Sequence, residues 1–185
     1  GEPSVDVVDV PLNLGIAIGF SSHQKTAGTE DMRKVLQSPV ASEVFVIQGG
    51  RIAAATAAMA RGDVDRLLEI IGGDGFHEPR RADIGGYGNF SADELLELKK
   101  TLFRKLHLAL NVSGAGPNMQ ILFSKREYPK GIADAVSPAI IPWFQERGIK
   151  LTVRDMEIAQ GGAYDYAIKE YGYKQNDPCA CPPLE

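Results

Sequence analysis

Strand-type and helix-type segments follow one another along this chain in a set order, which constrains the fold more than any other feature. Apolar residues recur at every second position over 12–20, a pattern typical of a half-buried strand. Two more strands are predicted over 108–113 and 119–124, joined as a hairpin by the loop Gly114–Asn118. Alternation of apolar and polar residues predicts a last strand over about 149–158.

Helical periodicity fills the spaces between these strands. Helices are predicted over about 30–37, 39–61, 64–71, 92–106 and 131–147. Thr29 is predicted to cap the first of them, and Ser91 with Glu94 forms a capping box at the start of helix 92–106. Pro138 and Pro142 are expected to break helix 131–147.

One pair of glycines lies inside a predicted helix. Gly49 and Gly50 cost helix 39–61 about 2 kcal/mol relative to alanine. Either another helix or a ligand approaches closely there, or the pair reflects poor helix propensity and nothing more.

The order of strand, helices, strand hairpin, helix and strand indicates an α+β fold. We expect a ferredoxin-like, mainly antiparallel four-stranded sheet with its helices packed on one face. Residues 1–175 are expected to form a single domain, and residues 176–185 an irregular tail.

Charge and composition exclude several classes of partner. The chain has 20 Lys and Arg against 24 Asp and Glu, a net charge of −4, which argues against nucleic acid. No apolar run reaches the roughly 18 residues of a membrane span, so no membrane partner is expected. The cysteines, Cys179 and Cys181, offer no disulfide framework, which fits a cytoplasmic protein, and as a lone pair they are weak evidence for metal. A small-molecule ligand is therefore the favoured partner, and no metal site is assigned.

The hairpin loop is the first candidate site. Gly114, Ala115, Gly116, Pro117 and Asn118 could bring backbone N–H groups close to an anion, because glycine has no Cβ. The same five residues would also serve as an ordinary turn.

The glycine-rich stretch 72–90 is the second candidate, and it is predicted to be a loop. Arg80 and Arg81 offer planar guanidinium groups that match a carboxylate or a phosphate, although paired surface arginines are commonly just solvated. His77 is expected to form hydrogen bonds, since no nucleophile with a suitably spaced base accompanies it. No catalytic residue is assigned.

The third candidate is the strand-to-helix transition 25–33, which contains Thr29. Free N–H groups at a helix start could meet an anion there, or the segment is simply a capped helix. The chain contains neither a P-loop motif nor a dinucleotide-binding glycine motif.

Together the three segments resemble the C-terminal half of the GHMP superfamily of ATP-dependent small-molecule kinases. Lys25–Leu36 resembles the family's Thr/Ser-Thr-Glu-x-x-Arg segment, and Arg61–Arg81 resembles the Arg-Gly-Asp helix followed by His-x-Pro-x-Arg of homoserine kinases. Val112–Ser124 resembles the Gly-Ser/Ala-Gly-Pro motif. The branch of mevalonate diphosphate decarboxylases is similar as well, and the substrates of both branches carry a carboxylate and a hydroxyl.

The resemblance implies a kinase that phosphorylates a homoserine-like hydroxyl, with His77, Arg80, Arg81 and Thr29 binding the substrate. The loop Gly114–Asn118 would support the phosphate loop. ATP and Mg²⁺ would be held mainly by an N-terminal half, in the same chain or another, without which this chain is expected to be inactive. A homodimer is compatible with the resemblance. The competing hypothesis is a non-catalytic module that binds a metabolite or mediates assembly.

Overall fold

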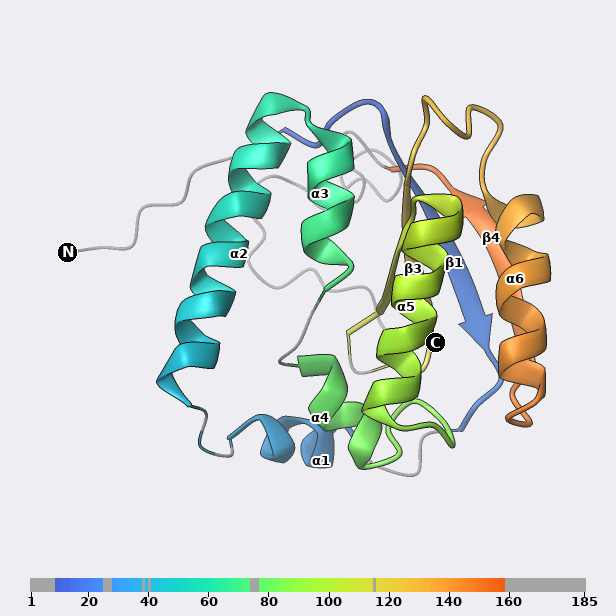
Figure 1. The fold of residues 1–185 in the computed structure, drawn as a ribbon. Coiled ribbons are helices and arrows are strands. Elements are labelled where there is room, and N and C mark those ends of the chain that lie inside the picture. The colour runs from blue at the N-terminus through green and yellow to red at the C-terminus, as the bar shows by residue number, and fades with distance from the viewer. Residues whose placement is uncertain are drawn as a thin grey trace, which may run out of the picture.

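A four-stranded antiparallel sheet organises the described part of the chain (Figure 1). The structure, a computed structural model, describes residues 9–24, 28–37, 39, 41–73, 77–114 and 116–158. The strands are β1 (Leu14–Ser21), β2 (Ala109–Val112), β3 (Met119–Ser124) and β4 (Leu151–Met156), in the spatial order β2-β3-β1-β4. This order and the antiparallel pairing confirm the predicted α+β class and ferredoxin-like sheet. The predicted tail 176–185 lies outside the described residues, and the extent of the single domain stays a prediction.

Six α-helices accompany the sheet in the described part of the chain. They are α1 (Thr29–Lys34), α2 (Ser42–Arg61), α3 (Val64–Ile71), α4 (His77–Asp83), α5 (Ala92–Leu106) and α6 (Ala133–Gln145), and a short 3₁₀ turn, Val35–Gln37, follows α1. Helix α5 has the predicted bounds, because the Ser91 and Glu94 capping box forms as expected. Glu94 Oε2 accepts a hydrogen bond from Ser91 N at 2.9 Å, and Ser91 Oγ accepts one from Glu94 N.

The helices pack on both faces of the sheet, whereas the sequence predicts one face. Leu110 and Ile121 are partners across β2 and β3, and they join the core cluster that contains the apolar stripes of α5 and α6. Ala109 and Leu122 point to the opposite face, where they pack with Leu67 of α3 and with α2. In Figure 1, α2 and α3 accordingly lie on the left, and α5 and α6 on the right. The second layer could not be expected from β-α-β order, because α2 and α3 belong to a helical insertion.

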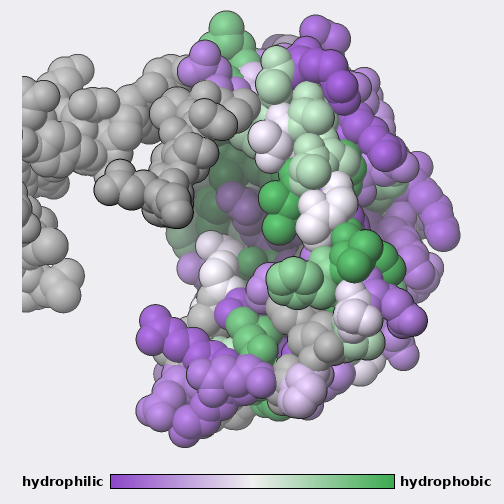
Figure 2. Space-filling view, turned by 90° about the vertical axis from the view of Figure 1, so that its left-hand side faces the viewer, coloured by the Kyte–Doolittle hydropathy of each residue, from purple (hydrophilic) through white to green (hydrophobic). Residues whose placement is uncertain are grey.

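Helix α2 runs unbroken through Gly49 and Gly50. A Cβ added at either glycine would meet no atom within 4 Å among the described residues, so no described helix approaches closely there, and the approach of a ligand stays a prediction. Phe45, Val46 and Ile52 of α2 are 77%, 71% and 69% exposed. Figure 2, which looks onto the side that α2 occupies, shows apolar side chains gathered there.

The expected break in α6 is also wrong. Pro138 and Pro142 lie within a continuous helix, and both are exposed, four residues apart on one side. The buried residues Val136, Ile140 and Phe144 hold the helix to the core despite the two missing amide donors. None of the described helices combines the length and the apolar character that crossing a bilayer requires.

Candidate active site

A helix occupies part of the stretch that was expected to be a loop. Helix α4 covers His77–Asp83, within the predicted loop 72–90. Pro79 falls in its first turn, where a missing amide hydrogen costs nothing. Glu78 in the first turn and Arg80 and Arg81 in the last turn complement the helix dipole. A helix of this length is unstable in isolation, so contacts with the rest of the molecule must hold it.

A buried ion pair provides those contacts. Glu78 Oε2 contacts Lys99 Nζ of α5, and Glu78 Oε1 accepts a hydrogen bond from Val112 N at 2.5 Å. The side chains of Glu78 and Lys99 are only 7% and 3% exposed. Helix α4 is thereby fixed between α5 and the edge strand β2. This pair was not predicted from the sequence, although Lys99 lies four residues after Leu95, on the apolar stripe of α5.

Arg81 connects two of the candidate segments. Its Nη1 donates a hydrogen bond to the Gly114 carbonyl at 2.7 Å. Its Nε is buried and has no hydrogen-bond partner among the described residues. Because the hydrogen bond from Nη1 fixes the guanidinium group and Nε has an N–H that no described residue accepts, Arg81 can bind an anion in a defined orientation.

The two segments line one pocket of about 480 Å³, which lies between α2, α3, α4 and the sheet. His77, Arg81 and Gly114 contribute to its wall, as do Arg51 and Asn111, which the sequence analysis missed. Figure 2 shows the surface hollowed beside α2. The structure therefore brings together His77, Arg81 and Gly114 from the predicted set.

The charges that line the pocket favour an anion. Arg51 and Arg81 are cationic, while the carboxylate of Glu78 is neutralised by Lys99. Arg51 reaches the wall from α2 and donates from Nη2 to the Ile70 carbonyl at 2.8 Å. Among the described lining residues, two guanidinium groups carry positive charge, and the single carboxylate is already neutralised by Lys99.

The other predicted site residues have different surroundings. Arg80 Nη2 donates to the Pro39 carbonyl at 3.3 Å, and Arg80 is not part of the described pocket wall. Thr29 is the first residue of α1, whose N-cap is Gly28, so the predicted Thr29 cap is wrong. The Gly28 amide donates to Asp31 Oδ2 at 3.1 Å instead. A substrate contact by Thr29 stays a prediction.

The hairpin loop is held by its own contacts. Gly116 has a φ of +73°, and a Cβ there would lie 2.6 Å from the ring of buried Tyr87, so this position requires glycine. Asn118 Oδ1 accepts a hydrogen bond from Ser21 N at 3.1 Å, which ties the loop to β1. The Gly116–Pro117 peptide bond is cis. Ala115 lies outside the described residues.

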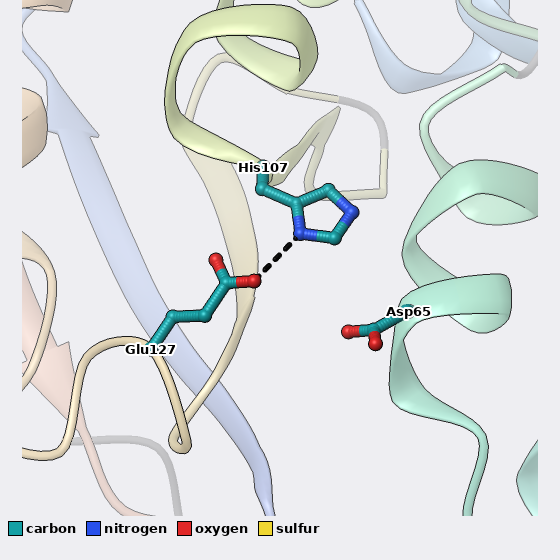
Figure 3. A group of neighbouring side chains, drawn as sticks. All are labelled: Asp65, His107 and Glu127. Atoms are coloured by element: carbon teal, nitrogen blue, oxygen red, sulfur yellow. Dashed lines mark hydrogen bonds and ion pairs between the residues drawn. The ribbon is translucent and has the colours of Figure 1, made fainter.

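A second group of polar side chains lies on the surface. Asp65 of α3, His107 at the end of α5 and Glu127 in the turn after β3 offer potential ligand atoms within 4.8 Å of one another (Figure 3). His107 Nδ1 and Glu127 Oε1 are 2.8 Å apart. All three residues are at least partly exposed, and the hydrogen bond between His107 and Glu127 accounts for the closeness of those two.

Comparison with known proteins identifies relatives of this chain. The chain is 31% identical over 152 residues to a homoserine kinase from Moorella thermoacetica, which covers 82% of this chain and 47% of the relative. It is 29% identical over 134 residues to a homoserine kinase from Pyrobaculum islandicum, covering 72% of this chain and 40% of the relative. No protein-family model matches the chain.

A solved structure has the same fold. The homoserine kinase of Cytophaga hutchinsonii superimposes with a TM-score of 0.66 at 22% identity, over 86% of this chain and 46% of that chain. The chain thus spans about half the length of the relatives that it matches.

Proposed function

Because the chain is a homologue of homoserine kinases and a member of the GHMP superfamily, we propose that it forms the substrate side of an ATP-dependent small-molecule kinase. The substrate is a small metabolite that carries a carboxylate and a hydroxyl, as homoserine does. One observation carries this proposal: Arg81 has a buried, unpaired Nε in a pocket whose uncompensated charge is positive. A carboxylate would satisfy that donor and balance that charge.

Arg81 is the proposed carboxylate ligand. The hydrogen bond from its Nη1 to Gly114 holds the guanidinium plane, so its remaining donors are oriented before the substrate arrives. His77 lines the same pocket and is proposed to contact a polar group of the substrate. Arg80 and Thr29, on neighbouring elements, are proposed to complete the substrate contacts.

The loop Gly114–Asn118 is proposed to support a phosphate-binding loop that this sequence lacks. Residues outside this sequence would hold ATP and Mg²⁺, in the same chain or in another. Phosphoryl transfer depends mainly on positioning and on stabilisation of charge, so orienting the acceptor hydroxyl is a sufficient task for this part. The coverage of about half of each relative supports this division of labour.

Titration calorimetry on the purified chain tests the proposal, with homoserine, threonine, mevalonate and pantoate as ligands. We expect homoserine to bind, and Arg81→Ala to weaken it at least about tenfold through loss of a charge-assisted contact. Arg104→Ala removes an equal charge from an exposed position on α5 and should leave the affinity unchanged. Equal affinity of the Arg81→Ala variant and the original chain for homoserine would contradict the assigned role.

The division of labour has its own test. ATP with Mg²⁺ should bind this chain only after an N-terminal GHMP half is added. In the assembled enzyme, Arg81→Ala should raise KM for the alcohol and leave KM for ATP nearly unchanged. Micromolar binding of ATP by this chain alone would show that the division is wrong.

A further inference from the structure

The charged groups in the described lining of the pocket favour an anionic ligand, because the two guanidinium groups, of Arg51 and Arg81, are accompanied by no free carboxylate. Glu78 is the one carboxylate among the described lining residues. Its two oxygens are engaged by Lys99 Nζ and by Val112 N. Among the described residues, the pocket therefore lacks an available anionic partner for a cationic group of a ligand.

Lys99 also fixes the orientation of Asn111. Its Nζ donates to Asn111 Oδ1 at 3.3 Å, and Lys99 has no acceptor atom, so the carbonyl end of the amide must face it. The amide nitrogen Nδ2 is then left buried, without a partner among the described residues. Asn111 lines the same pocket as Arg81, whose Nε is likewise buried and unpaired.

From these contacts we propose that Lys99 and Asn111 set the charge of the group that this pocket accepts. The carboxylate of the substrate binds between Asn111 Nδ2 and Arg81 Nε, and Lys99 acts as a positioning residue that neutralises Glu78 and orients Asn111. A substrate ammonium group finds no free carboxylate among the described residues of this site. The ligand class is thus a small hydroxy-carboxylate, recognised here without regard to its amino group. This inference rests on the proposed function, because it takes the pocket to be the acceptor-substrate site.

Both halves of the selectivity follow from desolvation. A carboxylate satisfies two buried donors that otherwise have no partner, so its binding removes an existing penalty. An ammonium group that enters the pocket loses its water and meets two guanidinium groups without an available carboxylate. Replacing Asn111 by aspartate should reverse this preference, because the donor Nδ2 becomes an anionic oxygen while Oδ1 can still accept from Lys99.

The experiment compares three ligands by calorimetry on the chain without ATP: homoserine, γ-hydroxybutyrate, which lacks the amino group, and homoserinol, which lacks the carboxylate. We expect the dissociation constants of homoserine and γ-hydroxybutyrate to agree within about threefold, and homoserinol to bind at least about tenfold more weakly. Homoserine binding at least about tenfold more tightly than γ-hydroxybutyrate would overturn the proposal, as would the absence of carboxylate binding at about 10 mM. This comparison uses the unaltered chain, so it does not depend on whether a variant folds.

The variant Asn111→Asp tests the assigned donor. It should weaken both carboxylates at least about tenfold and leave homoserinol unchanged or tighter. Gln145→Glu adds the same charge at the exposed end of α6 and should change none of the three affinities. Unchanged carboxylate affinity in the folded Asn111→Asp variant would overturn the role of Asn111.

Failure of this inference can be distinguished from failure of the proposed function. If Arg81→Ala abolishes carboxylate binding and Asn111→Asp does not, the kinase proposal stands and the selectivity proposal fails. If the ligand selectivity is as expected and the assembled enzyme transfers no phosphoryl group, the selectivity proposal stands and the kinase proposal fails.

Discussion

Breaking the buried pair of Glu78 and Lys99 should cost a large part of the free energy of unfolding. Replacing Lys99 by methionine keeps the length and the apolar stem of the side chain but removes the ammonium group that faces the buried Glu78 carboxylate, while the hydrogen bond from Val112 N stays in place. Removing one partner of a buried pair costs about 3–5 kcal/mol. A domain of ordinary stability, about 5–15 kcal/mol, would lose roughly a fifth of it or more.

A second variant separates the pair from the packing around it. The double variant Glu78→Gln with Lys99→Met removes both charges and keeps an oxygen that can accept from Val112 N. It should recover most of the loss, because replacing a whole buried pair is often nearly neutral. Lys100→Met, at the exposed next position of α5, should change the stability by less than about 0.5 kcal/mol.

Urea unfolding followed by circular dichroism measures the original chain, the single variants Glu78→Gln and Lys99→Met, the double variant and the Lys100→Met control. An unchanged m-value shows that the native and unfolded states remain comparable. The double-mutant cycle gives the coupling between the two side chains. A loss below about 1 kcal/mol for Lys99→Met, or additive effects in the double variant, would refute the assignment of a buried, mutually neutralising pair.

Three further predictions concern the loop and the helix ends. Gly116→Ala should destabilise the chain by about 1–3 kcal/mol more than Gly114→Ala in thermal unfolding, because both glycines have positive φ but only at Gly116 does a Cβ collide with Tyr87; equal losses would argue against the collision. The hydrogen bond that Glu94 accepts from the Ser91 backbone amide, with Arg147 contributing, holds the pKa of Glu94 below its usual range. Its stabilising contribution is therefore present above the ordinary Glu pKa and is lost as pH falls through the lower folded value, so Glu94→Gln should flatten the acid limb of a stability–pH curve. Asp155→Ala should cost about 1 kcal/mol in urea unfolding, since Asp155 Oδ1 accepts from Ile132 N at 2.7 Å at the start of α6; no loss would show that this cap is replaced by water.

Local signals predicted the elements that are stabilised locally. The capping box of Ser91 and Glu94 gave the bounds of α5 because its hydrogen bonds join residues three positions apart. Helix α4 was missed for the opposite reason: its stabilising partners, Lys99 and Val112, lie 21 and 34 residues from Glu78. Local propensity and glycine content describe that stretch as a loop, and only the tertiary contacts make it helical.

The candidate site also contains residues that local sequence signals reveal and residues that only distant contacts reveal. His77, Arg81 and Gly114 could be predicted, because charged and glycine residues stand out in a sequence. Asn111 could not, because it occupies an ordinary strand position and its significance depends on Lys99 turning its amide. Lys99 carried a usable signal, a charged residue on the apolar stripe of α5, which indicates a buried partner elsewhere in the chain.

The position of β1 in the sheet has a consequence for how the chain matures. β1 is the earliest of the described strands to be synthesised, yet both of its hydrogen-bonded neighbours, β3 and β4, are made much later. The contact between Ser22 Oγ and Lys150 N, at the β4 end of this pairing, joins residues 128 positions apart. During synthesis, both edges of β1 therefore lack these two partner strands until β3 and β4 have left the ribosome. Unpaired strand edges tend to associate with other chains. Expression yield should accordingly depend on translation speed and on chaperone supply more strongly than equilibrium stability alone would suggest.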